Sequence, residues 1–265
     1  MNNSACVIRC YGISRNPKTE EFIMVMDYAE NGNLRHYLSK NFNLLGWVDK
    51  LFMLIDLAKC FNNIHDNDLI HGDFHPGNVL VSNLFFITDM GLCKHANQKL
   101  TQNNEGKLYG VLPYVAPEVL RGKDHTQASD IYGFGIIALE VITGLSPYYN
   151  IAHDEYLAIK ICQGLRPISK YQIPQLLSDI INQCLDANPL NRPKSHTLSI
   201  LLSNLKDTYF DENSLFHKQI KDVDEINKRY SEFTSWSSIG CPTHSQAIYT
   251  SRSLDYKNLP KNDCS

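Results

Sequence analysis

Apolar residues recur at helical spacing early in the chain. Between Trp47 and His65 they occupy positions 47, 51, 54, 55, 58, 61 and 64, which lie on one face of an α-helix. Two runs rich in β-forming residues precede this segment, at 6–13 and 21–29. The sequence SRNPKTE between them holds an Asn-Pro pair and charges that are typical of a turn. The pattern predicts a β-hairpin followed by a long amphipathic helix.

The middle of the chain combines short strand patterns with helical ones. Residues 78–89 predict two short strands that meet at a Ser-Asn pair. The segment from Asp89 to Pro113 has little periodicity and is expected to be mobile. A helix that Ser129 would cap is apolar on all sides, which is typical of the centre of a domain. Further helices are predicted at 153–163, 174–185 and 193–204.

The last quarter of the chain is more polar. Apolar density falls after about Lys206; residues 211–233 are compatible with a polar surface helix, whereas 234–265 have the composition of a disordered tail.

Composition and charge narrow the function classes. The chain has 265 residues, 43% of them hydrophobic, which is enough for a sizeable core. Its net charge of -3 comes from 25 basic and 28 acidic residues mixed along the chain, so no nucleic acid and no anionic membrane are expected as partners. The longest apolar stretch, 131–142, is too short to span a membrane and contains Glu140.

Cysteine usage and the N-terminal sequence bear on the compartment. Eight cysteines without a C-x-x-C pair indicate reduced thiols rather than a zinc or redox site. The first residues lack the basic and apolar regions of a secretory signal. We therefore expect a cytoplasmic protein.

The motif LIHGDFHPGNVLV, residues 69–81, carries candidate chemistry. Asp73 is followed five residues later by Asn78, and Asp89 stands in the sequence DMG after the predicted strands. Mg²⁺ prefers hard oxygen ligands, and a nucleophilic hydroxyl needs a carboxylate that can accept its proton. The order Asp, Asn, Asp is therefore suited to phosphoryl transfer with magnesium.

These residues resemble the motifs of the eukaryotic protein kinase family, over about residues 6–205. The resemblance implies that Asp73 is the catalytic base and that Asn78 and Asp89 are magnesium ligands. It also places His75 beside the transferred phosphate, where serine/threonine kinases carry a lysine. An imidazole with an ordinary pKa of about 6.5 is a poorer cation at neutral pH.

Further motifs follow in the family's order. VAPEVL is similar to the end of an activation segment, and SDIYGFG to the family's central helix. The resemblance implies that Asp130 holds the backbone of the catalytic loop and that Arg192 pairs with Glu118. His71 and Gly91 have structural roles by the same resemblance.

Each motif also has a structural interpretation when it is taken alone. Asp73 and Asn78 are common turn residues, Asp130 would be favoured by the helix dipole, and Arg192 could be a solvated surface charge. Such interpretations predict no particular order or spacing, so together the motifs favour the kinase family.

The resemblance implies an α+β, protein-kinase-like fold with a mostly helical C-terminal lobe and an N-terminal lobe reduced to about two antiparallel strands. It divides the chain into a remnant of the N-terminal lobe with the hinge (1–30), the C-terminal lobe (31–205), and a polar helix with a disordered tail (206–265). ATP and Mg²⁺ are the implied cofactors, and a protein is the implied substrate, in intracellular signalling.

The predicted hairpin carries the adenosine site by resemblance. Met26 precedes the hinge, and the backbone of Asp27, Tyr28 and Ala29 would bond the adenine edge. Leu80 would contact the base from below.

Several departures from the family bear on activity. Only five residues precede Cys6, too few for a glycine-rich loop and a strand lysine, so we expect a truncated chain or an incomplete gene model. Gly72 replaces the arginine that would bind a phosphate on the activation segment. Val111 replaces a threonine that touches the base, which leaves serine/threonine and tyrosine specificity open.

Two other functions fit the sequence. A pseudokinase or scaffold is favoured by the missing lysine but disfavoured by the complete set of Asp73, Asn78 and Asp89. A small-molecule phosphotransferase of the aminoglycoside or choline kinase type has a similar catalytic loop, although that family lacks APE and DIYGFG. The sequence carries no signal of oligomeric state.

Overall fold

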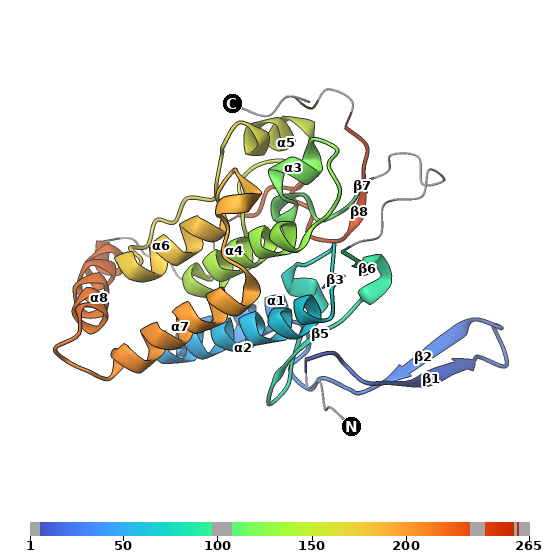
Figure 1. The fold of residues 1–265 in the computed structure, drawn as a ribbon, viewed down its shortest axis with the longest axis horizontal. Coiled ribbons are helices and arrows are strands. Elements are labelled where there is room, and N and C mark those ends of the chain that lie inside the picture. The colour runs from blue at the N-terminus through green and yellow to red at the C-terminus, as the bar shows by residue number, and fades with distance from the viewer. Residues whose placement is uncertain (1–5, 97–107, 234–241, 257–258, 260–265) are drawn as a thin grey trace.

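The computed structural model of the protein describes residues 6–96, 108–233, 242–256 and 259. The α-helices are α1 (Leu34–Asn41), α2 (Trp47–Asp66), α3 (Pro117–Leu120), α4 (Gln127–Thr143), α5 (Glu155–Cys162), α6 (Gln175–Cys184), α7 (Ser195–Tyr209) and α8 (Leu215–Phe233). The strands are β1 (Cys10–Arg15), β2 (Phe22–Met26), β3 (Leu69–Ile70), β4 (Val79–Val81), β5 (Phe85–Ile87), β6 (Lys94–His95), β7 (Leu108–Gly110) and β8 (Arg252–Leu254). Helices with short antiparallel strand pairs make an α+β fold, as predicted (Figure 1).

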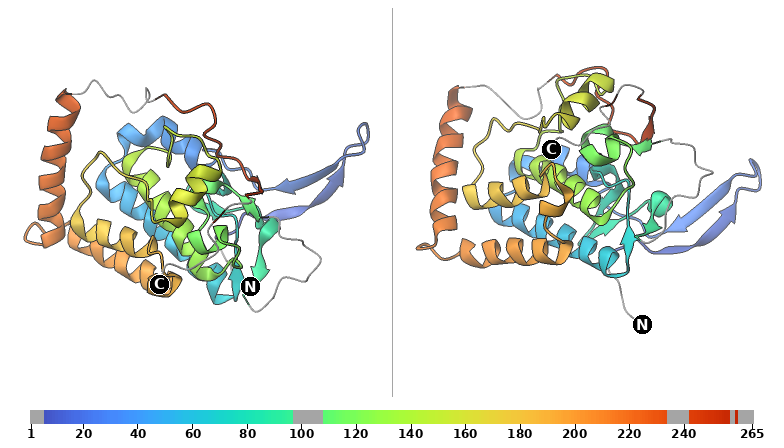
Figure 2. Two further views of the ribbon diagram at one scale, coloured as in Figure 1. Left: turned by 90° about the horizontal axis from the view of Figure 1, so that it is seen from above. Right: turned by 45° about the horizontal axis from the view of Figure 1, so that its top comes forward.

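A two-stranded hairpin projects from the helical body. Strands β1 and β2 pair antiparallel, with Arg15 opposite Phe22. Every residue of both strands is exposed, including the apolar side chains of Ile13 and Phe22. Both views in Figure 2 also show the hairpin standing away from the helices. The predicted hairpin is confirmed, although β1 begins at Cys10 rather than at Cys6.

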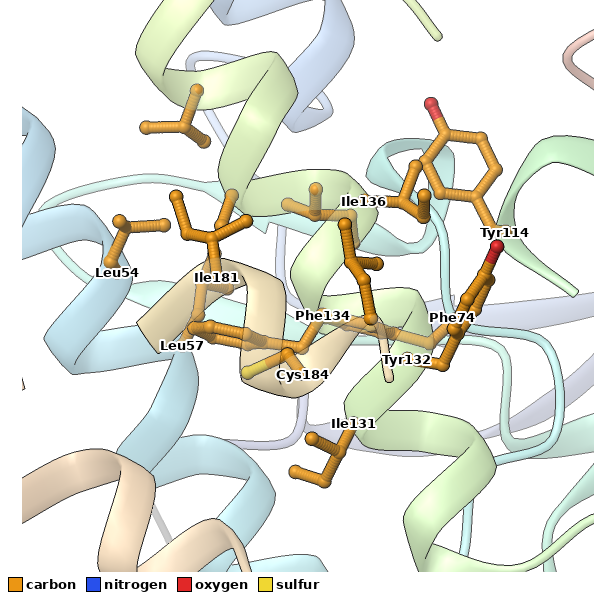
Figure 3. Close-up of a cluster of buried hydrophobic side chains, with 14 of the residues drawn as sticks. Leu54, Leu57, Phe74, Tyr114, Ile131, Tyr132, Phe134, Ile136, Ile181 and Cys184 are labelled. Carbon is orange, nitrogen blue, oxygen red and sulfur yellow. The ribbon is translucent and has the colours of Figure 1, made fainter. Parts of the chain in front are cut away.

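Helix α4 lies at the centre of the helical body. Nearly all of its residues from Ser129 to Thr143 are buried, because α2 and α6 both pack against it (Figure 3). The ring of Phe134 meets that of Phe61 from α2 edge to face, with centroids 6.5 Å apart. Burial of each large apolar side chain contributes roughly 1.5–3 kcal/mol. The all-round apolar pattern of this helix therefore reflects its central position.

The first turn of α4 differs from the prediction. Its N-cap is Thr126, not Ser129: the Thr126 hydroxyl accepts a hydrogen bond from the backbone N–H of Ser129 at 3.2 Å. In return, the Ser129 hydroxyl accepts one from the N–H of Thr126 at 2.9 Å. This capping box satisfies two N–H groups that the helix itself leaves without partners. The helix begins at Gln127, and Asp130 remains in its first turn.

A methyl group added at Gly135 of α4 is expected to destabilise the protein. A Cβ atom there would lie 2.8 Å from Cδ2 of Leu185 and 2.9 Å from Cβ of Cys184. We expect Gly135→Ala to lower the free energy of unfolding by about 1–3 kcal/mol through overpacking, although alanine favours a helix by about 1 kcal/mol. Urea unfolding followed by circular dichroism measures this change. A variant as stable as the wild type would show that α4 and α6 can separate without cost.

The other predicted helices are confirmed with shifted ends. They are α2, α5, α6 and α7, of which α7 continues to Tyr209 beyond its predicted end at 204, and the polar helix α8. Helix α1 was not predicted, because eight mostly polar residues give little periodicity. Its N-cap is Asn33, whose side chain accepts a hydrogen bond from the N–H of His36 at 2.9 Å. Among the described residues, none of the helices has the length and apolarity needed to cross a bilayer.

The segment after the second predicted strand is partly ordered. Strand β6 pairs with β3, which places Lys94 opposite Ile70, and β7 pairs with β8. The prediction of a mobile segment therefore does not hold for these strands, and its part at 97–107 lies outside the described residues.

Residues 242–256 lie against the helical body. Strands β7 and β8 run antiparallel with Arg252 opposite Gly110, and Figure 1 shows them side by side. The side chain of Leu254 is buried in the core. The expectation of a disordered tail is wrong for these residues, because backbone pairing to β7 and a few apolar contacts hold a segment of low apolar density.

Candidate active site

A buried carboxylate fixes the loop between β3 and β4. Asp130 accepts hydrogen bonds from the backbone N–H groups of His71 at 2.9 Å and Gly72 at 3.0 Å. The ring of His65, at the end of α2, lies 3.0 Å from the same carboxylate. Burial acts to raise the pKa of Asp130. The hydrogen bond and charge of His65, together with the hydrogen bond from the backbone of Gly72, outweigh burial, so the pKa is lowered overall. Asp130 therefore stays ionised and holds the loop, a contact the resemblance implied, whereas the role of His65 was not expected.

Asp73 follows directly on this loop. Its backbone N–H donates to Nδ1 of His71 at 3.2 Å, and its carbonyl accepts from Nδ2 of Asn78 at 2.9 Å. The side chain is nearly buried. Burial raises the pKa of Asp73, and a hydrogen bond from Ser251 acts in the opposite direction. A carboxylate of raised pKa accepts a proton more readily than a solvated one, which suits a general base.

Two further side chains near Asp73 carry oxygen atoms that can bind a metal ion. The amide nitrogen of Asn78 is used on the loop carbonyl, which leaves Oδ1 of Asn78 as a ligand atom. Asp89 adopts a left-handed conformation with φ 59° and accepts the N–H of Gly91 at 3.4 Å. The N–H of Thr88, the residue before Asp89, donates to the carbonyl of Asn78 at 2.9 Å, which holds Asp89 beside the loop. The structure brings together the three residues that the sequence predicted.

This donor set fits a magnesium ion. Among the described residues no group of three or more His, Cys, Asp and Glu side chains is arranged to hold a metal. Mg²⁺ is commonly held by one or two carboxylates together with substrate phosphates and water. Asn78 and Asp89 would supply the protein's share of such a site.

His75 is a neutral residue beside Asp73. Its Nδ1 accepts the N–H of Gly77 at 3.0 Å, so the ring proton is on Nε2, which lies 3.8 Å from Oδ2 of Asp73. Burial lowers the pKa of His75 to about 3, and the positive charge of Arg35 acts in the same direction. His75 therefore carries no charge at neutral pH, and its role beside a transferred phosphate stays a prediction.

Burial of His75 is expected to make stability depend on pH. In the unfolded chain its pKa is about 6.5, whereas in the folded protein it is about 3. The unfolded state binds more protons between these values, so stability is lost as the pH falls below about 6.5. We expect the loss from His75 at pH 5 to be about 2 kcal/mol. Urea unfolding of wild type and His75→Asn at pH 7.5 and pH 5 measures it, and an equal pH dependence of the two proteins would contradict the assignment.

Gly72 is required by its backbone conformation. It has φ 81°, a left-handed value that favours glycine, and a Cβ atom there would lie 3.3 Å from the carbonyl oxygen of Leu92. The loop therefore presents no cation at this position.

The residues assigned to adenine lie along the hinge and β4. Tyr28 is exposed, and Ala29 is buried. The N–H of Asn31 donates to the carbonyl of Val81 at 3.1 Å, which places the hinge beside Leu80, the half-buried residue of β4. Their contacts with adenine stay predictions. The residues concerned are Met26, Asp27, Tyr28, Ala29 and Leu80.

A buried ion pair ties α3 to the helical core. The two terminal nitrogens of Arg192 each lie 2.7 Å from an oxygen of Glu118. The guanidinium also donates to the carbonyl oxygens of Ala128 and Asp186, both at 2.9 Å. The pairing implied by the resemblance is present, and four of the five N–H groups of the guanidinium donate to acceptors.

One buried network near the loop was not expected. The hydroxyl of Tyr114 donates to Glu140 at 2.5 Å and accepts from Arg35 at 3.0 Å. The Nε atom of Arg35 lies 3.5 Å from Glu140, and burial keeps the pKa of Tyr114 well above its usual value. In the sequence, Glu140 indicates that such a network exists, because a charged residue inside an apolar helix needs a partner.

Comparisons with known proteins agree with this geometry. The family model described as protein tyrosine and serine/threonine kinase matches residues 2–202. Probable serine/threonine-protein kinase gdt2 of Dictyostelium discoideum is 28% identical over 204 residues, which cover 74% of this chain and 12% of the relative. Probable serine/threonine-protein kinase gdt4 of the same organism is 31% identical over 196 residues, covering 70% and 12%.

A plant protein gives a similar match. The protein kinase and PP2C-like domain-containing protein of Arabidopsis thaliana is 27% identical over 230 residues, which cover 73% of this chain and 34% of the relative. The chain therefore spans between 12% and 34% of the length of these three relatives.

Proposed function

Because the chain belongs to the protein tyrosine and serine/threonine kinase family, we propose that it transfers the γ-phosphoryl group of ATP to serine or threonine hydroxyl groups of proteins. The observation that carries the proposal is the position of Asp73. It is a nearly buried carboxylate of raised pKa, on a loop held by Asp130, with Asn78 and Asp89 beside it. The names of the relatives favour serine and threonine over tyrosine.

The residues of the site have separate roles in this proposal. Asp73 accepts the proton of the attacking hydroxyl, and the clamp from Asp130 keeps its carboxylate in position. Asn78 and Asp89 would hold Mg²⁺, which would supply positive charge against the phosphates. The hinge and Leu80 would orient the adenine ring.

The two other functions have less support. A small-molecule phosphotransferase resembles the catalytic loop alone, whereas this chain also contains the Glu118–Arg192 pair and matches the protein kinase model over most of its length. A scaffold without turnover would not need Asp73, Asn78 and Asp89 together. We also propose an intracellular location, since no disulfide is present among the described residues.

The test is incorporation of labelled phosphate into general protein substrates such as casein and myelin basic protein. We expect label on serine and threonine after acid hydrolysis, and none when EDTA removes Mg²⁺. Label confined to tyrosine would overturn the proposed specificity. ATP binding without any incorporation would favour the scaffold.

A further inference from the structure

The C-terminal segment 248–254 crosses the candidate active site. Strand β8 of this segment pairs with β7, and the register places Arg252 opposite Gly110. Gly110 lies next to the catalytic loop, because a Cβ atom on it would be 3.6 Å from Oδ1 of Asp73. The residue just before Arg252 therefore lies close to the catalytic loop.

That residue is Ser251. Its hydroxyl acts on the Asp73 carboxylate as a hydrogen-bond donor that lowers the pKa of Asp73, against the burial that raises it. Ser251 is otherwise exposed. The register of β8 brings Ser251 close to the proposed base, and the effect of its hydroxyl on the pKa of Asp73 agrees with that position.

Tyr249 anchors the segment before Ser251. Its ring lies 4.7 Å from the guanidinium carbon of Arg35 and meets the ring of His153 edge to face at 4.8 Å. Its carbonyl accepts from Arg35 at 3.0 Å, and its hydroxyl donates to the carbonyl of Pro147 at 2.9 Å. The Arg35 side chain is held by Glu140, so the unexpected buried network supports this contact.

His153 holds the backbone of the segment. Its Nδ1 lies 2.9 Å from the carbonyl oxygen and 3.1 Å from the backbone nitrogen of Ile248, while its Nε2 lies 3.3 Å from the carbonyl oxygen of Tyr148. Burial lowers the pKa of His153, and its hydrogen bonds with the backbone of Ile248 and Tyr148 act in the opposite direction. Arg252 donates to the carbonyl of His153. The backbone of Ile248 and the side chain of Arg252, on either side of Ser251, are therefore both bound to His153.

Leu254 anchors the segment after Ser251. Its side chain is buried in the core, and it lies opposite Leu108 of β7. The segment therefore pairs with β7 as an added strand, and the side chains of Tyr249 and Leu254 anchor it on either side of Ser251. Proteins commonly hold an extended peptide in this way.

We propose that residues 248–254 occupy the peptide-substrate groove of this protein and that Ser251 is a hydroxyl that it phosphorylates in its own chain. The proposal rests on the proposed function. The oxygen of Ser251 forms a bond to the γ-phosphorus of a nucleoside triphosphate, and the bond from that phosphorus to the bridging oxygen breaks. The diphosphate leaves, and the hydroxyl proton passes to Asp73.

Phosphorylation of Ser251 is expected to release the segment. A phosphoserine carries about −1.5 to −2 charges at neutral pH, and it would stand beside the carboxylates of Asp73 and Asp89. The groove on β7 would then be open to other proteins. In such protein substrates, we expect an aromatic residue two positions before the acceptor serine and an apolar residue three positions after it, as Tyr249 and Leu254 flank Ser251.

The experiment is phosphate mapping on the purified protein incubated with Mg²⁺ and labelled ATP. We expect Ser251→Ala to lower self-incorporation at least tenfold. Thr250→Ala and Ser253→Ala are the matched controls, since they remove hydroxyls next to Ser251, and both should stay within twofold of the wild type. The rate constant should not change over a tenfold range of protein concentration, because donor site and acceptor lie in one chain.

Casein in the same reaction separates the two proposals. Label on casein without label on Ser251 would overturn the inference and leave the proposed function intact. Label on neither would overturn the proposed function, and the inference with it. A rate constant that rises in proportion to protein concentration would overturn the intramolecular step.

Hydrogen exchange tests the position of the segment without turnover. Pairing with β8 protects backbone N–H groups of β7, so Leu254→Asp should speed their exchange at least tenfold. Asp255→Ala, a change at an exposed neighbour, should leave their exchange unchanged. Equal exchange in the wild type and Leu254→Asp would overturn the placement of the segment in the groove.

Discussion

Replacement of Asp73 by asparagine is expected to lower phosphoryl transfer by roughly 10²–10⁴-fold, the usual contribution of a general base. Asparagine preserves the shape of the side chain, but its amide cannot accept the proton of the attacking hydroxyl. The loop contacts use the backbone of Asp73, with His71 and Asn78 as partners, so they remain in the variant. Initial rates with labelled ATP and casein measure the effect.

The fold of the Asp73→Asn variant should be intact. Burial already opposes ionisation of Asp73, so a neutral amide is expected to leave the melting temperature unchanged or slightly higher. Asp179→Asn is the matched control, because this carboxylate lies on the exposed surface of α6 and should have no effect on turnover. If Asp73→Asn kept turnover within twofold of the wild type, Asp73 would lose its proposed role.

Much of the site could be predicted because its residues act over short distances along the chain. Asp73 and Asn78 belong to one loop, and their contact is made across five residues. Helix α2 was predicted because its buried face repeats over twenty residues, many more than α1 offers. Local periodicity and local spacing are the features that a single sequence expresses most directly.

The C-terminal segment could not be predicted for the opposite reason. Its anchors Tyr249 and Leu254 are single apolar residues in a polar stretch, and their partners lie far away in the sequence. Arg35 is one of these partners, and β7 is another. Backbone pairing is independent of side-chain type, so a three-residue strand such as β8 leaves almost no compositional signal. The segment that reaches Asp73 was therefore found only in three dimensions.

The partners of buried polar side chains could be predicted from the sequence only in part. The resemblance implied the contacts of Asp130 and Arg192, since both belong to motifs. The network around Glu140 had a visible signal in its lone charge, but the sequence did not identify Arg35 and Tyr114 as its partners. A buried charge predicts that a partner exists, whereas the fold decides which residue it is.

Removal of the Arg192 side chain is expected to give the largest loss of stability. Arg192→Ala should lower the free energy of unfolding by about 3–5 kcal/mol, the usual cost of breaking a buried ion pair from one side. The carboxylate of Glu118 would be left buried without its cation, and the carbonyls of Ala128 and Asp186 would lose a donor. Urea unfolding followed by circular dichroism measures the difference.

Two further variants separate the ion pair from other effects of the substitution. Lys194→Ala removes an exposed cation two residues away and is expected to change stability by less than about 0.5 kcal/mol. Glu118→Gln combined with Arg192→Met removes both charges and keeps the approximate volumes, so the double variant should be more stable than Arg192→Ala. This order follows because the main cost is an unpaired buried charge, and replacing both partners removes that charge. If Arg192→Ala and Lys194→Ala had equal stability, Arg192 would not pair with Glu118 in solution, and α3 would be held by its apolar contacts alone.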